Sequence, residues 1–438
     1  MDDTIAMDDD EEWCGHDEGY PLVQATIRLY FTTPVIIFGL VANSVNVLIF
    51  SHTHMRSQLV NWFFMALSVC DTALLLATFF FLILPVMAER SHNFFLIDLS
   101  QRILVHMYPW AMITQTCGVY LTVMVGIHRY LGVCHPFLIR RVGSSGPVKL
   151  ALATTVAFSV LFNVTRWLEV TNKSCRSEIF ENATSVLVWT TELMHAPLYS
   201  STYRIAAYTV VMFLVPFLTL IVTNCLIVRT LRQSSRLRRR MTVRTGSFVS
   251  SNNNTIKRFS GDGHANLKNV ICAKVQEQKE NGITVMLLAV VAGFLAFNAL
   301  AFINNILEIL LKVHVLPPEF EAFYTTLVEV GNLMVNVNSA STIFIYLFFG
   351  SKYRSIFLRY WRRVIKLTAQ KKGISDTAIL NETTFLVVTT VVDAGRKQSL
   401  VEKTKRACSV RGKRDFRYSM TTPPKRPSVI TAGTNDST

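Results

Sequence analysis

An arginine stands at the end of a long apolar stretch. From Gln115 to Pro136 the sequence reads QTCGVYLTVMVGIHRYLGVCHP, with no charged residue before His128-Arg129-Tyr130. A guanidinium is permanently charged and is costly inside hydrocarbon, so Arg129 must lie at a water interface or against a partner. We therefore expect Arg129 to have a functional role.

Two more polar side chains interrupt apolar stretches. Asn43 follows Gly39-Leu-Val-Ala, and Asp71 is the only ionisable residue between Trp62 and Met87. A carboxylate in such a place is by default a functional group that faces the interior of a helix bundle. The alternative is a neutral structural acid that is hydrogen-bonded to Asn43. The later residues that could line the same site are Asn338, Ser339 and Thr342.

The elements that must hold these groups are membrane spans. Of the 438 residues, 50% are hydrophobic and 17% are charged, a balance that a bilayer accommodates more simply than a soluble core does. Seven apolar stretches have about the 20 residues that a helix needs to cross hydrocarbon. They are Thr26–Ser51, Trp62–Met87, Ile103–Cys134, Leu150–Arg166, Ile205–Val228, Ile283–Leu311 and Ala322–Phe349. The expected fold class is all-α, a bundle of seven transmembrane helices.

The distribution of charge predicts the orientation in the membrane. The chain has no Lys or Arg before Arg28, and the many acidic residues there argue against a cleavable signal peptide. Basic residues gather at Arg140, Arg141 and Lys149, at 236–240 and in the C-terminal tail, and such loops stay in the cytoplasm. We expect a multi-pass plasma-membrane protein with an extracellular N-terminus and a cytoplasmic C-terminus. Basic segments beside a bilayer explain the net charge of +15 without nucleic acid as a partner.

Four segments follow from this pattern. Residues 1–25 are expected to form an acidic extracellular tail, 26–349 the bundle, 350–367 an amphipathic helix on the membrane surface, and 368–438 a disordered cytoplasmic tail. The surface helix is predicted because its apolar residues recur at three and four positions. The inner loop of about 229–280 is expected to continue the fifth helix and then to be partly disordered.

Several residues together resemble the rhodopsin-like (class A) G protein-coupled receptors. In the order and spacing of that family, these are Asn43, Asp71, Arg129-Tyr130 before Cys134-His135-Pro136, Pro216, Phe294, and Tyr346 before Lys352-Tyr353-Arg354. The resemblance covers about residues 26–366. Three stretches are most similar to the invertebrate FMRFamide-type neuropeptide receptors, namely QTCGVYLTVMV, NVTRWLE at 163–169 and NNILE at 304–308.

The resemblance implies a receptor that binds an extracellular neuropeptide and opens the inner end of its bundle to activate heterotrimeric G proteins. In the family, the arginine matched by Arg129 is held by the preceding acid and by an acid at the base of the sixth helix. Here His128 replaces the first acid and Glu280 supplies the second, so we expect an Arg129–Glu280 pair to hold the inner end closed. Tyr346 belongs to the same switch, and Asn224 replaces the inner tyrosine of the fifth helix. The Ser/Thr-rich tail is compatible with a receptor kinase and arrestin as partners.

Receptors of this family usually join the top of the third helix to the second outer loop by a disulfide. Cys175 has the loop position, but the helix position is Leu104, and Cys117 lies about 20 Å deeper, which is too far for a bond. The other outward cysteine is Cys14. We therefore hypothesise a Cys14–Cys175 bond that clips the acidic tail over the mouth of the bundle, the alternative being two free thiols. Sequons in the same outer loop predict N-glycosylation at Asn172 and Asn182.

The kind of ligand is predicted from charges near the outer ends of the spans. Small amine ligands of the family depend on a carboxylate in the third helix, and no acid lies between Arg102 and His128. Glu169, Glu308 and Glu329 could each pair with an arginine of an amidated RFamide-like peptide, and Glu329 is the preferred candidate. The residues that could receive the peptide's ring or amide include Tyr108, Trp110, Gln115, Trp167 and Asn305.

Two other function classes stay open. A channel or transporter would show inverted repeats, broken helices or several embedded charges, and a receptor for a different peptide class would share the same fold. No catalytic constellation, phosphate-binding loop or His/Cys metal site stands out, so we expect no enzyme activity, no metal and no cofactor. Whether a sodium ion binds near Asp71 is left open.

Overall fold

The computed structural model describes residues 14, 19–138, 145–177, 180, 183–250, 262–312 and 315–371. For 235–250, 262–284, 318 and 365–371 it describes the backbone only. Most of the expected terminal tails and the sequon at Asn182 lie outside these residues.

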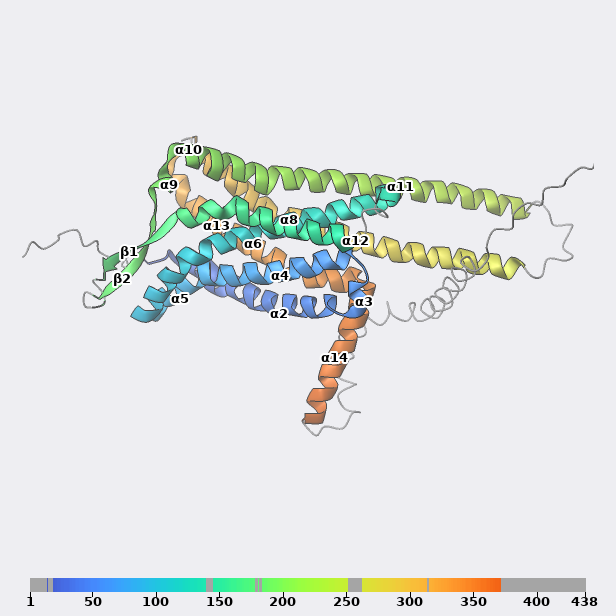
Figure 1. Ribbon diagram of the computed structural model, residues 1–438, viewed down its shortest axis with the longest axis horizontal. Coiled ribbons are helices and arrows are strands. Elements are labelled where there is room, and N and C mark those ends of the chain that lie inside the picture. The colour runs from blue at the N-terminus through green and yellow to red at the C-terminus, as the bar shows by residue number, and fades with distance from the viewer. Residues whose placement is uncertain are drawn as a thin grey trace, which may run out of the picture. The chain divides into compact units, whose positions relative to one another are not determined.

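Seven helices in the described residues are long and apolar enough to cross a membrane, which confirms the seven-span bundle (Figure 1). They cover Leu22–Phe50, Val60–Ser91, Phe94–Cys134, Ser145–Leu168, Pro197–Ser234, Val285–Lys312 and Glu321–Phe349. Every expected apolar stretch falls within or largely overlaps one of them, because hydrocarbon leaves the backbone no partner other than its own helical hydrogen bonds.

Several spans are built from consecutive helical pieces. The first span consists of α1 (Leu22–Thr26), η1 (Ile27–Thr32) and α2 (Thr33–Phe50). After the short helix α3 (Thr53–Arg56), the second span consists of α4 (Val60–Thr78), η2 (Phe79–Ile83) and α5 (Leu84–Ser91). The third span is the single helix α6 (Phe94–Cys134). The fourth consists of α8 (Ser145–Asn163) and η3 (Val164–Leu168). The fifth is preceded by α9 (Glu192–His195) and consists of α10 (Pro197–Tyr199), η4 (Ser200–Ala207), η5 (Val210–Leu214) and α11 (Val215–Ser250). The remaining helices are α12 (Asp262–Lys312), η6 (Pro318–Phe320), α13 (Glu321–Phe349) and α14 (Ser351–Lys371).

The third span begins nine residues before the expected Ile103. Asn93 caps α6, its side chain accepting a hydrogen bond from the Leu96 N–H at 3.3 Å. One turn later Asp98 and Arg102 form an i,i+4 ion pair at 2.8 Å. Capping and i,i+4 pairing stabilise helical turns that hydropathy alone does not reveal.

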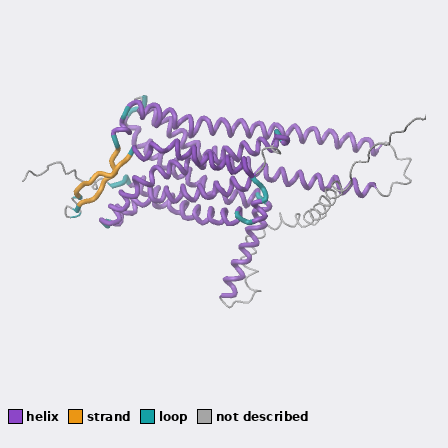
Figure 2. Tube along the Cα trace, viewed as in Figure 1, coloured by secondary structure: helices purple, strands orange, loops and turns teal. Residues whose placement is uncertain are grey.

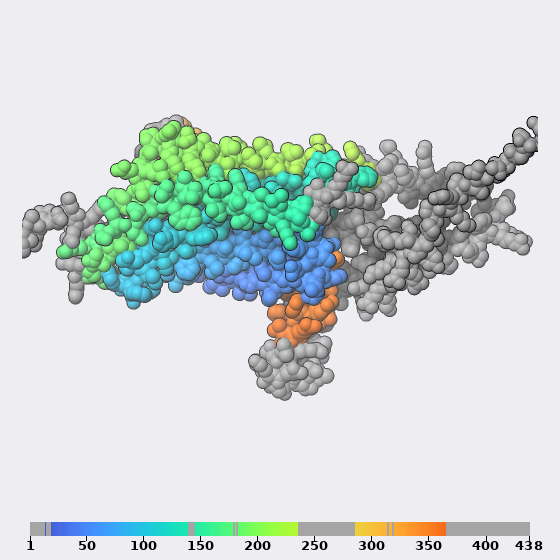
Figure 3. Space-filling view, viewed as in Figure 1, coloured from blue at the N-terminus to red at the C-terminus, as the bar shows by residue number. Residues whose placement is uncertain are grey.

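An antiparallel hairpin, not expected from the sequence, connects the fourth span to the fifth. β1 (Val170–Arg176) pairs with β2 (Thr184–Thr190), end residue to end residue. Figure 2 shows the two strands at one end of the bundle. The Ser185 hydroxyl of β2 donates to Asp98 of α6 at 3.1 Å, so the hairpin contacts the start of the third span (Figure 3). We call this end of the bundle the hairpin end, and the end near α3 the opposite end.

Aromatic packing dominates the core at the opposite end. Phe50, Phe64, Tyr346 and Tyr353 are each at most 2% exposed. Their ring centroids lie 5.0 to 5.7 Å apart in five pairs. Close van der Waals contact of this kind is what holds helices together in lipid, where burial of apolar surface gives little driving force.

The helices on either side of the inner loop reach further than expected. α11 continues to Ser250 and α12 begins at Asp262, so much of the loop at 229–280 has helical backbone. Its Arg, Lys, Gln and Glu residues are good helix formers, which explains the extension. Beyond the last span, α14 confirms the short amphipathic helix, with Tyr353 and Ile356 buried and Arg359 exposed.

Candidate functional site

A strap of the N-terminal tail is fastened to the hairpin end. Cys14 and Cys175 form a disulfide with their Cα atoms 5.2 Å apart, the first of the two alternatives that the sequence left open. The Cys14 N–H also donates to the Arg176 carbonyl at 2.8 Å. Further along, the Tyr20 N–H donates to both carboxylate oxygens of Glu89, at 3.2 and 3.1 Å. The tail is thus held by both the hairpin and the end of α5.

Glu329, the preferred candidate for a ligand contact, is already paired within the protein. Arg28 of η1 donates two hydrogen bonds to the Glu329 carboxylate, from Nε to Oε2 at 3.0 Å and from Nη2 to Oε1 at 2.5 Å. The two side chains are 12% and 5% exposed. The Tyr20 ring covers the guanidinium, with 4.9 Å between the Arg28 Cζ and the ring centroid. A ligand cation that reaches Glu329 must therefore displace Arg28 and Tyr20.

Sequence reasoning missed Arg28 as part of this site. Arg28 and Glu329 lie 301 positions apart in the sequence, so local spacing could not connect them. The available signal was that Arg28 is the first Lys or Arg in the sequence and stands inside the first apolar stretch. A charge at that depth needs a partner.

Glu169 belongs to a buried group that we call the Glu169 cluster. Its members are Tyr108, Arg166, Glu169, Tyr199 and Arg204. The Arg166 Nη1 donates to both oxygens of Glu169, at 2.9 and 3.0 Å. The Tyr108 and Tyr199 hydroxyls donate to the same carboxylate at 2.6 and 2.8 Å. Glu169 is 0% exposed, so this carboxylate is fully enclosed.

The third acid, Glu308, is the most accessible of the three. It pairs with Lys312 at 2.8 Å one turn along α12, and the two side chains are 35% and 38% exposed. Exposed i,i+4 pairs hold their partners weakly. Glu308 can therefore exchange Lys312 for a ligand cation at little cost.

The remaining expected ligand residues lie in different surroundings. The Trp110 and Trp167 rings contact each other edge to face at 5.9 Å, and Trp110 is 49% exposed. Asn305 accepts a hydrogen bond from the Thr209 hydroxyl at 2.6 Å. Gln115 lines a cavity deeper in the bundle. The structure therefore does not bring all the expected ligand residues into one place.

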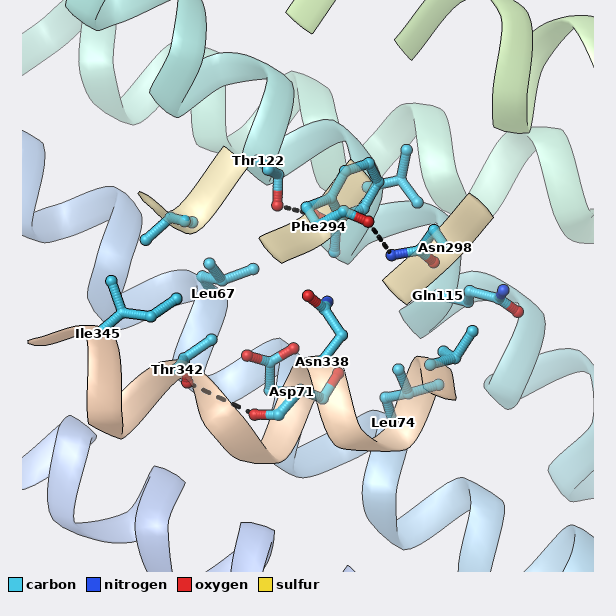
Figure 4. A pocket seen from close by; sticks show the side chains of 15 residues that line it. Leu67, Asp71, Leu74, Gln115, Thr122, Phe294, Asn298, Asn338, Thr342 and Ile345 are labelled. Carbon is cyan, nitrogen blue, oxygen red and sulfur yellow. Dashed lines mark hydrogen bonds between the residues drawn. The ribbon is translucent and has the colours of Figure 1, made fainter. Parts of the chain in front are cut away.

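That cavity brings together most of the expected intramembrane polar residues. It has a volume of about 30 Å³, which is room for about two water molecules. Figure 4 shows Asp71, Asn338 and Thr342 on one side of it, with Phe294 and Asn298 on the other. One carboxylate oxygen of Asp71 has no hydrogen-bond partner among the described residues. The carboxylate, amide and hydroxyl oxygens present are of the type that a small hard cation prefers.

Asn43 lies beside this cavity and connects it to the opposite end through a line of hydrogen bonds. The Asn43 amide donates to the Ser339 carbonyl at 3.0 Å, and its Oδ1 accepts from the Asn46 amide at 3.2 Å. The Oδ1 of Asn46 in turn accepts from the Tyr353 hydroxyl of α14 at 2.5 Å. We call Asn43, Asn46 and Tyr353 the polar line.

The expected switch residues gather at the opposite end. The His128 ring packs on Phe63 at 5.7 Å, and the Tyr130 hydroxyl lies 3.1 Å from His135 Nε2. Tyr346 is fully buried. Asn224 of α11 is half-buried. The side chain of Glu280 lies outside the described residues, so the Arg129–Glu280 pair stays a prediction.

Of the two expected glycosylation sites, the structure describes one. Asn172 lies in β1 opposite Val188 and is half-buried. Its placement on the hairpin keeps it at the same end of the bundle as the Cys14–Cys175 bond, and its glycosylation stays a prediction.

Comparison with known proteins agrees with this architecture. The sequence profile of the rhodopsin family of seven-transmembrane receptors matches residues 42–346. An FMRFamide receptor of Drosophila melanogaster is 27% identical over 369 residues, which are 81% of this chain and 59% of the relative. An FMRFamide peptide receptor of Caenorhabditis elegans is 26% identical over 320 residues, 73% of this chain and 66% of the relative. The chain thus spans less than two thirds of either protein.

A third relative, a probable G-protein coupled receptor of Caenorhabditis elegans, is 27% identical over 363 residues, 79% of this chain and 80% of the relative. The profile match includes the residues of the cavity, and it ends at Tyr346 in the core of the opposite end. With its seven spans, the chain belongs to the rhodopsin family of seven-transmembrane receptors and is close to the FMRFamide-type receptors.

Proposed function

We propose that this protein is a plasma-membrane receptor for an extracellular amidated peptide of the Arg-Phe-amide kind, and that the bound peptide activates heterotrimeric G proteins. The observation that carries the proposal is the similarity, along most of this chain, to two receptors named for FMRFamide. In this proposal the hairpin end faces outward and the opposite end faces the cytoplasm, as the basic residues at 236–240 and in the tail favour.

The charges at the hairpin end suggest where the arginine of such a peptide binds. Glu308 gives up only an exposed lysine, whereas Glu329 holds a buried bidentate arginine and Glu169 is fully enclosed. Displacing a desolvated partner costs far more than displacing a hydrated one. We therefore place the ligand guanidinium first at Glu308, with Glu329 as a second site if Arg28 moves aside.

The signal has a short physical route to the opposite end. The cavity around Asp71 and the polar line join the middle of the bundle to α14. A ligand that shifts α12 or α13 relative to α6 changes the walls of that cavity, since all three helices line it. Opening of the helix ends around Arg129 then exposes the surface that a G protein reads.

The test is a ligand screen on the full chain in cells that express a promiscuous G protein. We expect an Arg-Phe-amide peptide to trigger nucleotide exchange, and its free-acid and citrulline analogues to be weaker. Glu308→Gln should reduce potency for the arginine peptide about tenfold, as loss of a charge-assisted hydrogen bond implies, and should not affect the citrulline analogue. Glu192→Gln, at an exposed acid of the same end, is the matched control.

Two results would point to other functions. A ligand-gated current in cells without G proteins would favour a channel. Activation by a peptide without arginine, insensitive to both Glu308→Gln and Glu329→Gln, would assign the receptor to a different peptide class.

A further inference from the structure

The Glu169 cluster carries more positive than negative charge. It holds two guanidinium groups, those of Arg166 and Arg204, and one carboxylate. The side chains of Arg166, Glu169 and Arg204 are 5%, 0% and 21% exposed. Among the described residues, Glu169 is the only acid within ion-pair distance of either guanidinium. One positive charge is therefore left uncompensated in a largely enclosed place.

The single carboxylate cannot serve both arginines. It accepts hydrogen bonds from Tyr108, from Tyr199 and twice from Arg166. A carboxylate offers about four lone-pair sites, so these bonds use its capacity. The Arg204 Nε remains 3.9 Å from Glu169 Oε1, beyond hydrogen-bond distance.

The geometry leaves donors without acceptors. The Nε atoms of Arg166 and of Arg204 are buried and have no hydrogen-bond partner within the described part of the chain. The Arg166 guanidinium instead lies over the rings of Tyr203 and Tyr208, at 5.1 and 5.5 Å from their centroids. A buried charged donor without an acceptor is costly, and an anion that reaches it recovers that cost.

The cluster lies where a ligand at the hairpin end can reach it. The Glu169 carbonyl accepts from the Thr191 N–H at 2.9 Å, which ties the cluster to the base of the hairpin. Arg204 is the outermost charge of the cluster, with about a fifth of its side chain exposed. The Tyr208 ring, 5.5 Å from the Arg166 Cζ, supports the other face of the cluster.

We propose that Arg204, backed by Arg166, binds a carboxylate of the peptide ligand, an aspartate or glutamate side chain on the N-terminal side of its amidated end. The inference rests on the proposed function and deepens it, because it makes the preferred ligand dipolar. The cationic residue of the peptide pairs with an acid such as Glu308. Its acidic residue accepts the hydrogen bonds from Arg204 that Glu169 cannot accept. A guanidinium fork favours a planar carboxylate that accepts two parallel hydrogen bonds.

A double-mutant cycle between receptor and peptide tests the pairing. Two amidated peptides that differ only by Asp against Asn are measured by radioligand competition on wild-type receptor and on Arg204→Gln. On wild type, the Asp peptide should bind at least tenfold more tightly. Arg204→Gln should remove this preference while leaving the affinity of the Asn peptide unchanged within about twofold. Arg204→Lys, which keeps the charge without the fork, should retain part of the preference.

Controls separate this site from a general effect of charge or folding. Arg102→Gln removes an exposed arginine near the hairpin and should keep the Asp preference. Surface expression from an N-terminal epitope tag identifies variants that fail to fold. Equal affinity of the two peptides for wild type, or an equal loss for both peptides in Arg204→Gln, would overturn the proposal and leave the cluster a structural element.

A second arm does not depend on finding the peptide. Purified receptor in nanodiscs is heated with N-acetylaspartate amide, N-acetylasparagine amide, chloride or phosphate. Stabilisation by the aspartate compound alone, absent in Arg204→Gln, supports a carboxylate site. Equal stabilisation by chloride or phosphate would mean that the site binds a free anion and not a peptide side chain. If none of the compounds stabilises the receptor, the proposed anion site does not exist. If this arm succeeds while no amidated peptide activates the receptor, the proposed function fails and the carboxylate site stands.

Discussion

Arg28 forms an ion pair with Glu329, which lies 301 positions further along the sequence. Its bidentate contact with Glu329 is nearly enclosed, and removing one partner of such a pair leaves an uncompensated charge. Arg28→Met should therefore destabilise the receptor by about 3–5 kcal/mol, measured as thermal unfolding in nanodiscs. The double variant Arg28→Met with Glu329→Leu should recover most of that loss, because no charge is then left unpaired.

The same pair also bears on ligand binding at the residue level. If ligand arginine displaces Arg28, then Arg28→Gln should increase the affinity for the arginine peptide and not for its citrulline analogue. If it binds at Glu308 only, both affinities should stay near the wild-type values. Competition binding of the two peptides to wild-type receptor and to Arg28→Gln distinguishes these cases, with Arg102→Gln as the exposed control.

At the scale of elements, the attachment of Cys14 to the hairpin depends on a disulfide bond between residues 161 positions apart in the sequence. A native disulfide typically contributes about 2–4 kcal/mol to stability. Cys14→Ser should reduce thermal stability and ligand affinity, and the double variant with Cys175→Ser should lose no more than either single one. Cys225→Ser, at an exposed free cysteine, should change neither. Non-reducing peptide mapping that recovered both thiols alkylated would contradict the bond.

The polar line ties the start of α14 to the bundle through Tyr353. Tyr353 is buried and donates to the buried Asn46, so Tyr353→Phe leaves the Asn46 oxygen without its donor. An unsatisfied buried acceptor costs about 1–3 kcal/mol, and we expect that loss in thermal unfolding. Tyr130→Phe removes a hydroxyl from an exposed contact with His135 and should cost much less. Equal effects of the two changes would argue against the line.

The spans could be predicted from sequence because hydrocarbon imposes a length that any apolar run displays. The Asp71 site was also predictable, since a lone carboxylate in such a run has to face other polar groups. The ion-pair partners of the acidic residues could be predicted only in part. Arg166 stands three positions before Glu169, so that pair was readable, but Arg28 meets Glu329 only in the folded bundle. The hairpin was not predicted, although TSVLVWT has strand character, because a short apolar run does not reveal the segment with which it pairs.

For the whole molecule, the central requirement is that the two ends of the bundle face opposite sides of the membrane and act on each other. Single cysteines in place of Ser91 and Lys352, at the hairpin end and at the start of α14, should be labelled by impermeant maleimide from outside and from inside respectively.

Agonist-driven nucleotide exchange should be lost in Arg129→Ala, since a G protein then meets no guanidinium at the inner end. Glu280→Ala should raise exchange without ligand, because the predicted pair that restrains Arg129 is removed. Labelling of both cysteines from one side would contradict the odd number of spans, whereas unchanged basal activity in Glu280→Ala would remove only the lock and leave the topology intact.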